Sequence, residues 1–179
     1  MSLGIPSFGP MAQHMAMHIL AMNLAAPLIA MFLLRTRPLA PTGRALALAT
    51  VLQLALLWAW HAPGVLASAL HDPVLHVAMQ LSLFAAALWF WLAVLAQKGA
   101  TRWLAMAALL ITGKLFCLLG VLLVFTPRVL YSPGVVALPD QQLAGLLMIA
   151  ACPATYVAVG VVIAWRWLAE LGPAEARTG

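Results

Sequence analysis

Five long apolar segments, separated by short stretches rich in charged residues, proline and glycine, dominate this chain of 179 residues. They cover residues 12–34, 45–60, 74–97, 102–125 and 141–168. A membrane-spanning helix needs about 20 apolar residues, and four of the segments reach that length. The second is shorter, but Trp58, Trp60 and the His61-Ala62-Pro63-Gly64 that follows indicate an interfacial end and a turn. We therefore predict an all-α, integral membrane bundle of about five transmembrane helices.

The composition leaves little room for an aqueous domain. Hydrophobic residues make up 65% of the chain and charged residues 7%, whereas soluble domains average about 25% charged residues. We find no internal repeat or linker, so residues 1–179 are expected to form a single transmembrane helical domain. The net charge of +5 comes from single cations near the ends of spans, which argues against nucleic-acid binding. The first span lacks a preceding basic region and is expected to be retained.

The distribution of cations predicts the orientation in the membrane. The first and third loops contain Arg35, Arg37, Arg44, Lys98 and Arg102. The second and fourth loops together contain one such cation, Arg128. By the positive-inside rule, the N-terminus is outside and the C-terminus is cytoplasmic. All five histidines then lie toward the outer side of a multi-pass protein in a bacterial inner membrane.

Two histidines of the first segment are spaced to share one metal ion. His14 and His18 are four residues apart, which places their imidazoles one helical turn above each other. Met11, Met15 and Met22 fall on the same helical face. Thioethers beside imidazoles favour a soft ion such as Cu(I), although zinc would also accept the histidines. The methionines alone are typical of gap-filling core, but ionisable residues inside a span are costly and tend to mark functional sites.

The remaining histidines extend this site. His61 ends the second span and His76 begins the third, so the predicted topology brings both to the depth of the first pair. His71 belongs to the loop or first turn, where it is either a further ligand or an interfacial residue. We predict a metal centre drawn from His14, His18, His61, His76 and His71, with Met15, Met22 and Met79 as weaker ligands. Gln80, one helical turn after His76, adds a polar group beside it.

Lys114 is expected near the middle of the fourth span, where a buried ammonium needs a partner. We expect it to point inward and to bond Gln53, Thr112, Ser82 or a backbone carbonyl, or to be neutral. A structural interpretation makes it a polar clamp between helices. A functional one makes it a proton or anion relay, or a contact to a carboxylate on a partner inside the membrane.

Asp140 precedes the last apolar segment and is expected to cap that helix. Its depth would also allow it to orient a ligating histidine through a hydrogen bond. The proline-rich loop before it could lie over the mouth of the bundle. Cys117 and Cys152 lie in apolar runs and are expected to be free, unreactive thiols.

Several of these stretches occur together and in a recognisable order. They are His14 to Leu28, Trp60-His61-Ala62-Pro63, His71 to His76, Leu130-Tyr131 and Asp140 to Gly145. The combination resembles the polytopic CtaG-type proteins associated with assembly of cytochrome c oxidase, which are distinct from the single-span copper chaperone that shares the name. The resemblance implies an inner-membrane protein that helps to metallate or assemble a haem-copper oxidase, with the histidines as copper ligands. Five spans would make this chain a compact variant.

We therefore predict an assembly factor that binds or delivers copper at the periplasmic side, with oxidase subunits, the lipid bilayer and a periplasmic copper chaperone as partners. The chain shows no nucleophile, base and acid arrangement, so we do not expect an enzyme. One alternative is a small haem b cytochrome with His18 and His76 as axial ligands. Another is an accessory structural subunit of a respiratory oxidase, or a small permease, in which Lys114 matters and the histidines are interfacial.

Overall fold

The computed structural model describes residues 9–40, 42–131 and 136–175. The secondary-structure elements in these ranges are all helices. Five helical segments are long and apolar enough to cross a membrane, which confirms the predicted fold class. The first runs without a break through α1 (Pro10–Ile19), the π-helical η1 (Leu20–Ala25) and α2 (Ala26–Thr36). The others are α3 (Gly43–Trp60), α5 (Pro73–Leu95), α6 (Arg102–Phe125) and α7 (Leu138–Glu175), with a 3-10 turn, η2 (Gly99–Thr101), before α6.

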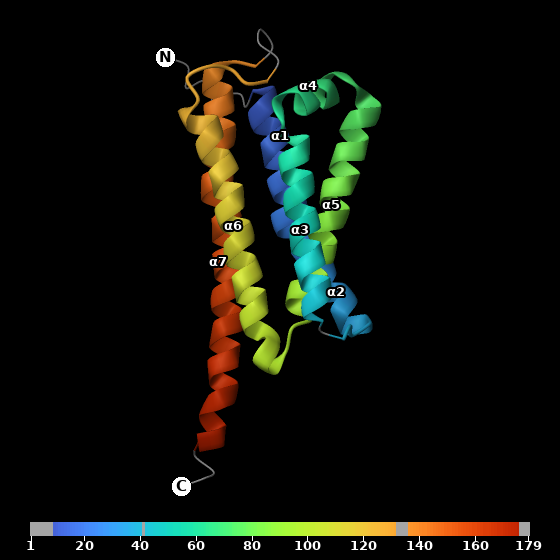
Figure 1. Cartoon of the computed structure of the whole chain (residues 1–179), viewed down its shortest axis with the longest axis vertical. Coiled ribbons are helices and arrows are strands. Elements are labelled where there is room, and N and C mark those ends of the chain that lie inside the picture. Colours follow the sequence, from blue (N-terminus) through green and yellow to red (C-terminus); the bar gives the residue numbers. More distant parts are fainter. Residues whose placement is uncertain (1–8, 41, 132–135, 176–179) are drawn as a thin grey trace, which may run out of the picture.

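The long helices run side by side along the long axis of the molecule (Figure 1). We call the end that contains the start of α1 and the connection from α3 to α5 the histidine end. The opposite end, with the connections from α2 to α3 and from α5 to α6, is called the basic end. There Arg102 forms an ion pair with Glu170 of α7, with 2.8 Å between nitrogen and oxygen. The predicted separation of histidines and loop cations to opposite ends is therefore present in the fold.

The connection between α3 and α5 is a helix rather than the predicted loop. α4 (Pro63–His71) lies across the histidine end of the bundle (Figure 1). Pro63 suits the first turn of this helix, where its missing N–H costs nothing. Asp72 ends α4 and caps α5, because its carboxylate accepts from the amides of Val74 and Leu75 at 2.8 and 3.4 Å.

Two glycines allow α6 and α7 to approach closely near the histidine end. A Cβ atom on Gly120 would lie 2.9 Å from the carbonyl oxygen of Gly145, and one on Gly145 would lie 2.6 Å from that of Gly120. Real Cβ atoms essentially never approach a carbonyl oxygen so closely, so this crossing depends on the absence of side chains at both positions. Small residues serve the same purpose at other helix contacts in membranes.

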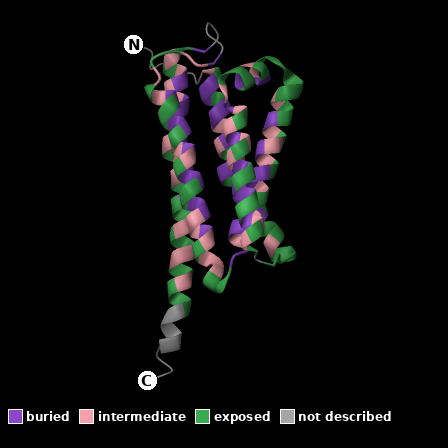
Figure 2. Cartoon of the chain, viewed as in Figure 1, coloured by how far each residue is buried: buried purple, intermediate pink, exposed green. Residues whose placement is uncertain are grey.

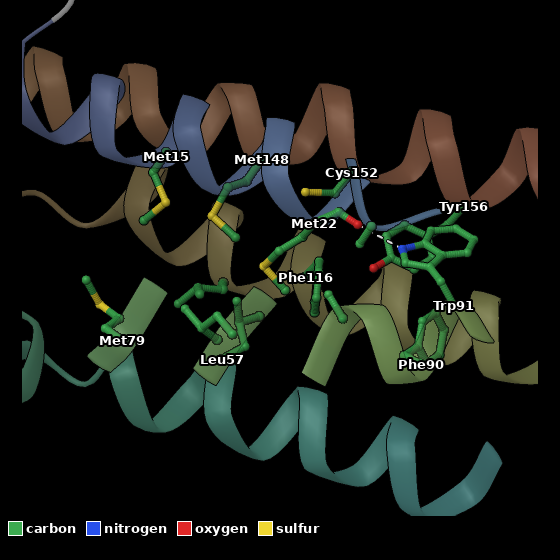
Figure 3. Close-up of a cluster of buried hydrophobic side chains, with 14 of the residues drawn as sticks. Met15, Met22, Leu57, Met79, Phe90, Trp91, Phe116, Met148, Cys152 and Tyr156 are labelled. Atoms are coloured by element: carbon green, nitrogen blue, oxygen red, sulfur yellow. Dashed lines mark hydrogen bonds between the residues drawn. The ribbon is translucent and has the colours of Figure 1, made fainter. Parts of the chain in front are cut away.

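Proline explains the π-helical segment of the first span. The amide of Ala26 bonds the carbonyl of Ala21, and Pro27 has no N–H to offer Met22. The Met22 carbonyl instead accepts a hydrogen bond from the indole Nε1 of Trp91, at 2.8 Å (Figure 3). A π-helical turn often marks a functional site, and this one begins two residues after His18.

Burial separates the interior of the bundle from its outer faces. Buried residues follow the inward faces of the helices, and exposed ones the outer faces (Figure 2). Large apolar side chains such as Phe125 and Trp165 are 76% and 74% exposed. Such exposure is costly in water but fits a surface that faces hydrocarbon.

Candidate metal centre

Three buried histidines from two helices meet at the histidine end. The Nε2 atoms of His14 and His18 lie 2.9 Å apart, and His61 at the end of α3 brings a third ring against them. One ring nitrogen of each residue lies within 4.8 Å of the others. The exposed fractions of the three residues are 6%, 4% and 3%. The predicted pairing of His14 with His18 is present, and His61 joins it.

His61 is fixed in the tautomer that suits a metal ligand. Its Nδ1 lies 2.7 Å from the carbonyl oxygen of Leu57, an acceptor only, so Nδ1 carries the proton and donates. Nε2 is then unprotonated, and it is buried without a hydrogen-bond partner among the described residues. Burial also lowers the pKa of His61 to about 4, so that the ring stays neutral at pH 7. A neutral imidazole oriented through its other nitrogen is the usual form of a ligating histidine.

The contact between His14 and His18 is compatible with a shared ion. Their Nε2 atoms form a hydrogen bond, in which one ring donates and the other accepts. Two imidazole nitrogens on a tetrahedral ion at 2.0–2.1 Å lie about 3.3 Å apart, so an ion between them requires a small separation of the rings and the tautomer of the donating ring that carries its proton on Nδ1. Both Nδ1 atoms are buried without a partner among the described residues, so no hydrogen bond through Nδ1 fixes the orientation of either ring.

His76 lies at the edge of this group, and His71 lies away from it. The ring centroid of His76 is 5.5 Å from that of His14, and the amide Nε2 of Gln80 donates to the His76 Nε2 at 3.3 Å. Gln80 therefore lies beside His76, as expected. His71 is exposed, and its Nδ1 donates to the carbonyl of Ala67 one turn back in α4. The formation of α4 turns His71 outward, so the structure does not bring this predicted ligand to the others.

Sulfur atoms line the interior directly beside the histidines. A cavity of about 20 Å³ borders His18 and His61, room for about one small ion or water molecule. Met15, Met22, Met148 and Cys152 also line it, and Figure 3 shows them converging from the first span and α7. Met148 and Cys152 were not predicted as part of the site; their spacing of four residues places them on one helical face but does not show that this face is inside. Met11 and Met79 are fully buried but do not line this cavity.

Asn23 is a further residue that the sequence did not reveal. It belongs to η1 and lines the same cavity. Its side chain is 4% exposed and lies against the Cys152 thiol, a weak partner, and neither amide atom has a nitrogen or oxygen partner among the described residues. A buried amide without a strong partner costs about 1–3 kcal/mol, so this position favours a polar or ionic guest in the cavity.

Comparison with known proteins decides the family. The model of the cytochrome c oxidase caa3 assembly factor family matches residues 8–170. The chain belongs to this family. The resemblance identified in the sequence is thereby confirmed, and the chain is a multi-pass membrane protein of oxidase assembly. No curated protein and no solved structure matches it.

In this assembly factor, Asp140 caps a helix other than its own. α7 begins at Leu138, and the Asp140 carboxylate accepts from the amides of Met11 and Ala12 at 2.9 and 3.1 Å. The predicted cap of the last helix and the predicted contact to a histidine are therefore both replaced by a cap on α1. A Cβ atom at Gly9 would collide with this carboxylate, so a larger residue there would displace the cap. The negative charge also suits the positive end of the α1 dipole.

The connection between α6 and α7 packs against His61. Tyr131 is buried, and its hydroxyl donates to the carbonyl oxygen of His61 at 2.9 Å. Gln141 of α7 holds the neighbouring backbone, because its Oε1 accepts from the amide of Leu130 at 2.7 Å. The described part of this loop thus lies over the mouth of the bundle, as expected, and it fixes the end of α3 from outside.

The prediction that Lys114 points inward is wrong. Its side chain is exposed on the outer face of α6. Two of the interior groups expected to pair with it form other hydrogen bonds. Gln53 donates to the hydroxyl of Tyr156 at 2.9 Å, and Ser82 accepts from the indole of Trp60 at 3.0 Å. The remaining candidate, the Thr112 hydroxyl, is buried without a partner among the described residues.

Proposed function

We propose that this assembly factor binds one copper ion at His14, His18 and His61 and supplies it to a haem-copper cytochrome c oxidase. The observation that carries the proposal is the meeting of three buried imidazoles, one of which is held with its free Nε2 inside the protein. Neutral imidazole suits copper and zinc, so the nitrogen ligands alone do not choose between these metals. His76 is close enough to His14 to supply a fourth ligand after a side-chain rotation.

The sulfur atoms beside the histidines favour Cu(I) over zinc. Thioethers and thiols are soft donors, and Met15, Met22, Met148 and Cys152 line the adjoining cavity. Methionine binds an ion less firmly than a thiolate does, and its flexible side chain can follow a moving ion. A centre that combines imidazoles with thioethers can therefore hold copper and still release it, as delivery requires.

The distribution of cations supports loading and release on the periplasmic side. With the basic end cytoplasmic, the histidine end faces the periplasm of a bacterial inner membrane. A periplasmic copper chaperone would load the site there, and the partners within the bilayer would be subunits of the oxidase. The chain's own role is binding and transfer of the ion, which requires no chemical catalysis.

A haem b cytochrome has less support from the same residues. Axial histidines lie on opposite faces of a haem, but the ring of His14 lies beside both members of the predicted axial pair, with centroids 4.3 Å from that of His18 and 5.5 Å from that of His76. The cavity of about 20 Å³ beside His18 is far too small for a macrocycle. An accessory subunit without a metal would leave unexplained why the buried Nε2 of His61 has no partner among the described residues.

The test of delivery uses cells that contain the oxidase but lack this factor. The cells receive the natural chain, a His14→Ala/His18→Ala variant, or a His71→Ala variant as a matched control at an exposed histidine. Copper content and turnover of the oxidase are then measured in isolated membranes. The proposal expects the double variant to fail to restore both quantities and the control to restore them. Full restoration by the double variant, at equal protein level, would overturn the proposal.

A further inference from the structure

Lys114 places a cation at the middle of an outer helical face. α6 contains 24 residues, so at 1.5 Å per residue Lys114 lies about 17 Å from either end of the helix. Its side chain is exposed rather than packed into the bundle. A cationic side chain near a helix end can extend to the polar interface, but one at mid-depth is expensive unless it meets a partner.

The chain itself supplies no acid to Lys114. Of its acidic residues, Asp72 and Asp140 lie at the histidine end, and Glu170 and Glu175 lie near the end of α7 at the basic end. No hydrogen bond or ion pair joins Lys114 to the part of the chain that the structure describes. Its acceptor must therefore come from outside the chain.

A groove of about 270 Å³ between α6 and α7 lies directly beside this cation. Lys114 is the charged residue of its lining, which is otherwise mostly apolar. The small residues Gly113, Gly160 and Ala164 leave space in the groove for the backbone of another helix, as small residues do where helices pack in membranes. The groove lies on the basic side of the close glycine crossing of the two helices.

The face of α7 along this groove is unusually open. No side chain from Val157 to Glu170 is buried, and Figure 2 shows this stretch in green and pink. The remainder of the bundle thus covers α7 near the histidine end but leaves it uncovered toward the basic end. An uncovered apolar groove with one fixed charge is suited to a helix of complementary charge.

We propose that the groove between α6 and α7 docks a transmembrane helix of another membrane protein, and that this helix carries an Asp or Glu that pairs with Lys114. A second copy of this chain cannot fill the role, because it has no acidic residue at mid-depth. Lipid phosphates lie about 15 Å from the centre of the hydrocarbon, too far to be a regular partner. An ion pair between Lys114 and the acidic residue lowers the free-energy cost of holding each charge inside the bilayer. The groove therefore binds an acidic helix in preference to a purely apolar one.

A designed peptide tests the charge requirement directly. The probe is a fluorescent Leu/Ala transmembrane peptide with one central Glu, and its control has Gln at that position. Each is reconstituted in bilayers with the labelled full chain, and association is measured by energy transfer. Polar contacts between membrane helices contribute about 0.6–2 kcal/mol, so the Glu peptide should bind about 3- to 30-fold more tightly than the Gln peptide.

Variants at Lys114 complete this test. The preference for the Glu peptide should persist in Lys114→Arg and disappear in Lys114→Leu. Both substitutions lie on an exposed face and should leave folding intact. Equal binding of the two peptides to the natural chain, or a preference that survives in Lys114→Leu, would overturn the proposal.

Crosslinking in native membranes identifies the natural occupant. A photoreactive residue is placed at Val161 in the groove, or at Val77, which is exposed on α5, as a control. The proposal expects an adduct at Val161 only, formed with a protein whose spanning helix contains Asp or Glu, and several-fold weaker in Lys114→Leu. Adducts formed only with lipid or with a second copy would overturn it. Copper binding by Lys114→Leu should be unchanged, so this test is separate from that of the proposed function.

Discussion

Asp140 and Met11 are 129 positions apart in the sequence, yet the Met11 amide donates to the Asp140 carboxylate at 2.9 Å. The bond joins the first turn of α7 to the start of α1, one turn before His14. The start of the helix that carries the histidine pair is therefore fixed to α7. Asp140 contributes to the metal centre through this helix end and not by contact with a histidine.

Removal of this cap should weaken both the fold and copper binding. Asp140→Ala leaves two amides of α1 without an acceptor, and we expect a loss of about 1 kcal/mol in unfolding free energy. The affinity for Cu(I) should fall several-fold, because the start of α1 is no longer held. Asp72→Ala removes a comparable cap from α5 and should cost similar stability without the loss of affinity. Unfolding in detergent and Cu(I) titration measure the two effects; equal affinities in both variants would refute the coupling.

Gly145 should not tolerate a methyl group. In Gly145→Ala the new Cβ would approach the carbonyl of Gly120 to 2.6 Å, and overpacking of this kind costs about 1–3 kcal/mol. At Gly64 nothing lies within 4 Å of an added Cβ, so Gly64→Ala provides the control. The unfolding free energies of the two variants in detergent should differ clearly. Equal values would mean that α6 and α7 do not cross at this glycine pair.

Trp91 should be needed for the π-helical turn. Trp91→Phe removes the indole donor to the carbonyl of the buried Met22, at a cost of about 1–3 kcal/mol. Trp165→Phe, at a position 74% exposed, should have little effect. Comparison of the two variants in thermal unfolding checks the prediction, which fails if they are equally stable.

Tyr131 should stabilise the end of α3 below pH 10 and lose this effect in strong alkali. Burial raises the pKa of Tyr131 to about 12 from its usual value of 10. The folded protein therefore retains the phenolic proton that the unfolded chain loses between pH 10 and 12, so stability falls as the pH rises through this range. Tyr131→Phe removes this dependence along with the bond to His61. The difference in unfolding free energy between natural chain and variant should shrink from pH 10 to 12; a constant difference would refute the assignment.

Local patterns were sufficient to predict the five spans and the pairing of His14 with His18. Length and hydropathy are properties of each segment, and the four-residue spacing alone places two imidazoles on one helical face. The 9 residues of α4 were missed because so short a helix between two spans has no clear periodic pattern. The outward position of His71 follows directly from that helix.

Tertiary packing decided the rest of the site. An apolar helix surrounded by lipid and protein gives no sign of which face lies inside, so neither the outward position of Lys114 nor the inward positions of Met148 and Cys152 could be predicted. Asp140 was assigned to its own helix because a sequence shows only the nearest helix end. Asn23 was overlooked because the π-helical turn that directs it inward arises from Pro27 and Trp91 together.

The most direct test of the copper centre is a Cu(I) titration of the detergent-purified protein against a competing chelator, with metal analysis of the product. We predict about one tightly bound copper ion per chain for the natural protein and for His71→Ala, and no tightly bound copper for His14→Ala/His18→Ala. Equal copper content in all three proteins, or none in any of them, would contradict the assignment of the metal centre to these histidines.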